Sequence, residues 1–155
     1  MPAYASLYIT DQHGQPVLLN SSVYKPGKRQ IWQFPGGQMP RETPRRTAIR
    51  ETEQDTGLTL VCGLLLAVHF LSPEVTWPAN KFGLIFDGGA LSPEQLATIQ
   101  LDPDEHSKWD ARPVEQWGDV LNPHSMDLLR EVSRVARSGS TAYIEHIEGD
   151  FVDYI

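Results

Sequence analysis

GGQMPRETPRRTAIRETEQDTGL, residues 36–58, is the stretch that decides the fold, because a glycine bend is followed there by a complete set of helix signals. Thr43 is a favourable N-cap, and Pro44 suits the first helical position. Gly57 fits the position just past the end of a helix. The sequence therefore predicts a helix between Thr43 and Gly57 that is entered from the pair Gly36-Gly37.

The charges of this predicted helix run against its dipole. A helix favours acids in its first turn and bases in its last turn. Arg45 and Arg46 nevertheless lie in the first turn, and the second half holds the acids Glu51, Glu53 and Asp55. Glu51 and Asp55 are four residues apart and share one face, where two carboxylates suit a hard cation such as Mg²⁺. The alternative is a solvated helix with Arg–Glu pairs and no bound ion.

The spacing within the segment resembles a known motif. Gly36 is followed after five residues by Glu42, and after seven more by RETEQDTGL, residues 50–58. This pattern resembles the Nudix box of the Nudix hydrolase superfamily, in which a glycine, five residues, a glutamate and seven residues precede Arg-Glu-aliphatic-x-Glu-Glu-x-Gly-aliphatic. The resemblance implies an α+β fold, a Nudix-like α/β/α sandwich with a central mixed β-sheet.

The resemblance also implies an activity, the hydrolysis of the pyrophosphate linkage of a nucleoside diphosphate derivative with Mg²⁺ or Mn²⁺ as cofactor. The partner implied is a small nucleotide-type molecule. Carried over by position, the metal ligands are Glu51, Asp55 and Gln54, and Arg50 orients the carboxylates. The substrate contacts that we expect are Gly36, Gly37, Glu42 and, from the basic loop before the 31–34 strand, Arg29.

The chain departs from the motif at one acid in particular. Gln54 stands where the motif has glutamate, and an amide brings no charge and is a poor general base. We therefore expect weak activity, a shifted metal preference, or compensation by another acid. Glu105 is the candidate catalytic acid. It precedes the strand expected at 107–112, and many Nudix enzymes place a functional glutamate on a loop before a strand of this kind. The alternatives are a solvated loop acid at Glu105 and, for the whole chain, a Nudix-fold nucleotide sensor that hydrolyses poorly.

Alternating and apolar stretches outside the box predict the other elements. A second helix is expected from the cap Asn122 to Gly139, with one apolar stripe. The turn residues Asp87-Gly88-Gly89 are expected to end the strand 82–86. The predicted strands are 4–10, 16–20, 31–34, 64–71, 82–86 and 107–112.

Length and composition indicate one soluble domain, 1–155, with cytoplasmic localisation. A net charge of −7 disfavours general nucleic-acid or membrane binding. The tail 143–155 alternates apolar and acidic residues and could cap its own sheet or that of a partner, so a homodimer is one expected assembly.

The five histidines are scattered without metal-ligand spacing. Trp77 is a candidate for stacking on a base, against the alternative of a loop anchor.

Overall fold

The computed structural model describes residues 3–21, 31–72 and 79–147. A five-stranded mixed sheet has the order β4-β1-β6-β5-β8, in which β1/β6 and β5/β8 are parallel and the other pairs are antiparallel. Its strands are β1 (Ala3–Thr10), β4 (Gly36–Gln38), β5 (Leu65–Leu71), β6 (Lys81–Ala90) and β8 (Ala142–His146). A smaller antiparallel sheet, β3-β2-β7, consists of β2 (Val17–Ser21), β3 (Trp32–Gln33) and β7 (His106–Ala111).

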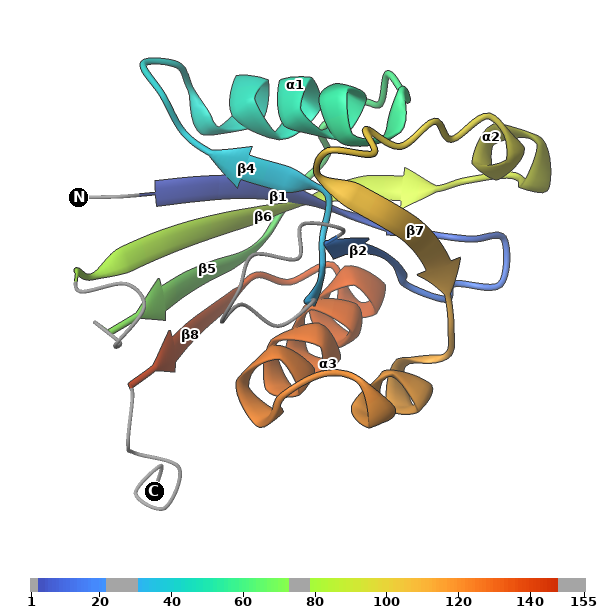
Figure 1. Cartoon of the computed structure of the whole chain (residues 1–155). Coiled ribbons are helices and arrows are strands. Elements are labelled where there is room, and N and C mark those ends of the chain that lie inside the picture. Colours follow the sequence, from blue (N-terminus) through green and yellow to red (C-terminus); the bar gives the residue numbers. More distant parts are fainter. Residues whose placement is uncertain (1–2, 22–30, 73–78, 148–155) are drawn as a thin grey trace.

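Helices cover the two faces of the large sheet (Figure 1). In β1 the side chains alternate, so that Leu7 and Ile9 pack in a core with Ala48 of helix α1, and Tyr8 packs in a second core with helix α3. The helices are α1 (Pro44–Thr56), α2 (Pro93–Ala97), the 3₁₀ helix η1 (Val114–Asp119) and α3 (Pro123–Ser138). This is the α/β/α sandwich on a mixed sheet that was predicted. None of the described helices is long and apolar enough to cross a membrane.

Local capping chemistry explains why both long helices begin and end where expected. Thr43 accepts a hydrogen bond from Arg46 N, and Asn122 accepts one from Ser125 N. Gly57 and Gly139 close the two helices with φ of 76° and 72°, in the left-handed region that glycine tolerates.

The predicted elements need three corrections, two to strands and one to a helix. The strand expected at 82–86 continues to Ala90, because Asp87, Gly89 and Ala90 stay paired with β1 across a register shift between Tyr8 and Ile9. The strand β4 was not predicted, since Gly-Gly-Gln has no apolar pattern. The helix α2 was not predicted either, although Ser92 forms a capping box with Gln95. The tail begins with β8, which pairs with β5 of its own sheet, and 148–155 lie outside the described residues.

Candidate metal and substrate site

The glycine pair forms the floor of the site. Gly36 and Gly37 lie in β4, which pairs with β1 beside α1. A Cβ on Gly37 would stand 2.6 Å from Cδ of Glu51, and a Cβ on Gly36 would stand 2.7 Å from Cα of Ser6. Only glycine therefore lets the Glu51 carboxylate lie directly against this backbone.

Arg50 contacts two acids of the predicted site, Glu42 and Glu51. Its guanidinium lies 2.7 Å from Glu42 Oε1 and 3.0 Å from Glu51 Oε1. It also donates a hydrogen bond of 3.1 Å to Oε1 of Gln54. The hydrogen bond to Glu42, and then the charge of Glu51, raise the pKa of Arg50, and the bond from Arg50 holds the pKa of Glu42 below its usual value. Arg50 thus holds Glu42 and Glu51 in place, while the Gln54 side chain is exposed.

Asp55 is the buried acid of α1, with 1% of its surface exposed. One carboxylate oxygen, Oδ2, accepts a hydrogen bond of 3.1 Å from Gly36 N. Burial raises the pKa of Asp55 to about 7, and the nearby charges of Glu51, Glu105 and Asp102 act in the same direction. None of the described lysine or arginine side chains pairs with it. Burial and the neighbouring acids therefore both disfavour the charged form of this carboxyl group.

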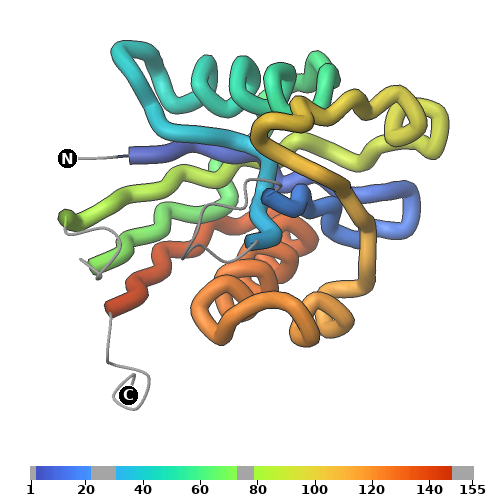
Figure 2. Tube along the Cα trace, viewed as in Figure 1, coloured from blue at the N-terminus to red at the C-terminus, as the bar shows by residue number. Residues whose placement is uncertain are grey.

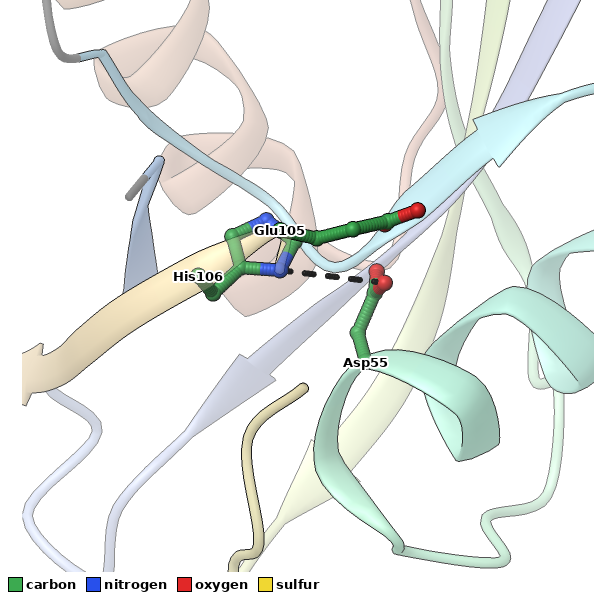
Figure 3. Close-up of side chains that lie close together, drawn as sticks. All are labelled: Asp55, Glu105 and His106. Atoms are coloured by element: carbon green, nitrogen blue, oxygen red, sulfur yellow. Dashed lines mark ion pairs between the residues drawn. The ribbon is translucent and has the colours of Figure 1, made fainter. Parts of the chain in front are cut away.

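Two neighbouring residues at the entry to β7 complete the cluster. The chain between α2 and β7 returns to the C-terminal end of α1, where Gln100 N donates to Thr56 O at 2.9 Å (Figure 2). At the start of β7, Glu105 is exposed and His106 is buried. Figure 3 shows both beside Asp55, with His106 Nδ1 lying 3.8 Å from Asp55 Oδ1.

These three side chains fit a divalent cation. One ligand atom from each of Asp55, Glu105 and His106 lies within 4.8 Å of the others. Oxygen and imidazole nitrogen are ordinary metal donors. His106 Nδ1 is buried and has no hydrogen-bond partner among the described residues, which is the kind of orphaned atom that a cation would satisfy.

The structure brings together some of the predicted site residues and separates others. Asp55 and Glu105 meet, and Glu51 is near enough to raise the Asp55 pKa. Gln54 contacts Arg50 instead of the cluster. Arg29 and Trp77 lie outside the described residues. His106 was missed as a site residue. Its only signal in the sequence was its place after Glu105.

A pocket of about 540 Å³ opens beside the glycine pair. Its lining includes Tyr4, Trp32, Gln33, His69, Asn122 and His124, together with both glycines. Its polar wall is formed by Tyr4 and His69, and His146 lies behind His69. Tyr4 Oη lies 2.8 Å from His69 Nδ1, and His69 Nε2 lies 2.7 Å from His146 Nδ1. Burial lowers the pKa of His69 to about 3, so this wall is uncharged at neutral pH.

Comparison with known proteins shows which family the chain matches and which solved structures have a similar fold. Residues 1–132 match the model of the NUDIX domain. The fold is similar to that of a MutT protein from Methanosarcina mazei Go1, with a TM-score of 0.72 and 24% identity over 87% of this chain and 94% of that one. It is also similar to a C. elegans Ap4A hydrolase, with a TM-score of 0.66 and 23% identity over 89% of this chain and 99% of that one.

A third similar structure is an ADP-ribose pyrophosphatase from Streptococcus suis, with a TM-score of 0.63 and 13% identity over 94% of this chain and 98% of that one. No curated protein matches the chain. At these identities the solved structures show the shared fold. The family is shown by the domain match, which covers most of the chain and contains the whole motif 36–58. This chain therefore belongs to the Nudix family.

Proposed function

We propose that this protein is a divalent-cation-dependent pyrophosphohydrolase that cleaves the diphosphate linkage of a nucleoside diphosphate derivative. The observation that carries the proposal is the meeting of Asp55, from α1, with Glu105, from the loop before β7, directly beside the bare backbone of Gly36. Two carboxylates from segments far apart in the chain, a helix and a turn, therefore converge on one point. No packing role requires such a convergence of like charges.

The residues that would hold the cation are Asp55 and Glu105, with Glu51 nearby. When bound, a divalent cation neutralises charge that develops on the transferring phosphoryl group and can lower the pKa of a water. Gly37 lets the Glu51 carboxylate lie directly against the backbone next to the other acids. Arg50, tied to Glu42 and Glu51, keeps the helix carboxylates in a fixed orientation.

The pocket beside the glycine pair supports a nucleoside as the other half of the substrate. Its volume of about 540 Å³ is in the usual range for small-molecule sites. Trp32 offers an aromatic wall, and Gln33 and Asn122 offer amides that can hydrogen-bond the edge of a base. A nucleoside there would place its diphosphate toward Gly36 and Gly37.

A panel assay tests the proposal. Metal-free protein would receive Mg²⁺ or Mn²⁺ and then ADP-ribose, Ap4A, nucleoside triphosphates or nucleotide sugars, with phosphate-containing products recorded. ADP-ribose and Ap4A come first, because they are named for two of the similar structures. Hydrolysis of one class that is lost in Asp55→Asn would support the proposal. No hydrolysis of any compound would contradict it.

One observation favours a second candidate, a nucleotide sensor. The Gln54 amide brings no charge to the position where the motif has an acid, and its oxygen is bound to Arg50. A sensor would bind one of the panel nucleotides in the calorimeter without turning it over. Replacing Gln54 by Glu separates the two functions further, because a large gain in turnover would show that the natural residue limits catalysis.

A further inference from the structure

His106 is the one residue of the cluster that the motif does not supply. Its side chain is 3% exposed, and it comes from the first position of β7, where the chain enters the small sheet. Nδ1 points toward Asp55 and Glu105 (Figure 3). Nδ1 is also buried without a hydrogen-bond partner among the residues that the structure describes. A buried nitrogen without a partner costs about 1–3 kcal/mol and calls for a specific reason.

The distance to Asp55 separates two possible reasons. Hydrogen bonds between nitrogen and oxygen span about 2.7–3.2 Å, and Nδ1 lies 3.8 Å from Asp55 Oδ1, too far for one. Two donor atoms that each lie roughly 2.1 Å from one cation are separated by about 3.0 to 4.2 Å, depending on the angle between them. The observed separation is that of two ligands of one ion, not of a donor and its acceptor.

The two oxygens of Asp55 have separate partners, consistent with this arrangement. Oδ2 accepts the Gly36 N–H at 3.1 Å, and Oδ1 is the atom that faces His106. The hydrogen bond from Gly36 therefore fixes the carboxylate and leaves the other oxygen turned into the cluster. Ligating carboxylates and histidines commonly have such a second contact that sets their orientation.

Gln33 of β3 supplies the second contact of His106. Its side-chain amide lies 3.1 Å from Nε2. The nitrogen is the amide atom that faces the ring, and a half-turn of the amide would bring the oxygen there instead. The oxygen would accept the Nε2 proton and leave the lone pair on Nδ1, the tautomer that binds a metal.

We propose that His106 Nδ1 is a nitrogen ligand of the cation held by Asp55 and Glu105, and that this centre selects a first-row transition cation, such as Mn²⁺ or Co²⁺, over Mg²⁺. The proposal deepens the proposed function and rests on its cation site. Mg²⁺ prefers an all-oxygen shell, whereas imidazole suits transition metals. His106 would thus supply the donor that is lost where Gln54, turned toward Arg50, replaces the motif's acid.

Binding of Mn²⁺ to the full-length, metal-free protein tests the proposal without any substrate. Electron spin-echo spectroscopy of the bound Mn²⁺ should show coupling to a ¹⁴N nucleus, the mark of a coordinated imidazole. Competition should require Mg²⁺ at about tenfold or more the Mn²⁺ concentration, the smallest usual effect of a changed metal shell. Asp55→Asn should abolish the nitrogen coupling although all five histidines remain.

Two substitutions at position 106 make the test specific. His106→Gln removes the nitrogen at the Nδ1 position, and we expect loss of the coupling and of the preference for Mn²⁺. His106→Asn keeps a polar atom near that position, and serves if the first variant unfolds early in EDTA. His13→Gln, at an exposed histidine of the turn after β1, is the matched control and should keep both signals.

The outcomes separate this proposal from the proposed function. Bound Mn²⁺ without nitrogen coupling in the wild-type protein would overturn the histidine ligand, even if the panel assay shows hydrolysis. Equal affinities for Mn²⁺ and Mg²⁺ would overturn the claimed selectivity. Nitrogen coupling that His106→Gln removes would support the ligand, even if no panel compound is hydrolysed.

Discussion

Acid should destabilise this protein through one buried histidine of β5, His69. Its side chain is only 4% exposed. It contacts Tyr4 Oη through Nδ1 and His146 through Nε2, at 2.8 and 2.7 Å. The groups around it are neutral or basic, since His124 stacks on His146 and the charge of Lys81 also acts on it. Burial, and then these neighbours, lower the pKa of His69 from 6.5 to about 3.

The sign and the size of the effect follow from that shift. Between pH 6.5 and pH 3 the unfolded chain binds a proton at His69 that the folded chain does not, so stability falls as the pH drops through this window. The contribution is fully present above pH 6.5. At pH 4 the loss is about 3 kcal/mol, at about 1.4 kcal/mol per pH unit. For a chain of this size that corresponds to about 6–12 °C in Tm.

Thermal unfolding followed by far-UV circular dichroism measures this loss. The experiment compares pH 7 with pH 4 at constant ionic strength in EDTA, so that cation binding does not contribute. His69→Gln keeps an amide that can face His146 but does not titrate, and its Tm should fall by about 6–12 °C less than that of the wild type. The control His13→Gln, at an exposed histidine, should fall as the wild type does. Equal losses in wild type and His69→Gln would refute the reasoning.

Three substitutions in the site give further expected outcomes. Gly37→Ala should reduce turnover and Mn²⁺ affinity, because its Cβ would stand 2.6 Å from Cδ of Glu51. An unchanged Mn²⁺ affinity in titration calorimetry would contradict this packing. Glu105→Gln should lower turnover on the identified substrate by roughly a hundredfold, and unchanged turnover would remove this residue from the mechanism. Gln54→Glu should change the transition-state energy by no more than about 1 kcal/mol, because the side chain faces Arg50; a much larger gain in steady-state assays would favour the sensor.

The parts of the fold that local chemistry determines could be predicted from the sequence. Helix α1 occupies Pro44–Thr56, between the two caps that were predicted for it, because capping depends on neighbours three or four residues away. Strand β4 could not be predicted, since nothing in Gly-Gly-Gln favours a strand. It forms because glycine allows the close approach to β1 at Ser6. That approach is a property of the assembled sheet and has no local signal.

The candidate site divides in the same way. The motif predicts Glu51 and Asp55 on one helix face, because their spacing is local. His106 meets Asp55 from 51 positions further along the chain, and no spacing within one element could indicate it. The histidine wall of the pocket was missed for the same reason, since His69 and His146 meet only where β5 and β8 pair side by side.

The unfavourable charge order of α1 has an explanation in these contacts. Arg45, in the first turn, donates to the carbonyls of Cys62 and Gly63 and lies over the Phe86 ring, so its position serves packing between α1 and the sheet. At the other end, Asp55 lies in the last turn, where the helix dipole opposes an acid and no basic residue compensates. A lysine at 55 would suit the dipole, but it would repel the cation. Asp55 therefore destabilises the metal-free end of the helix, and a bound cation would offset that cost.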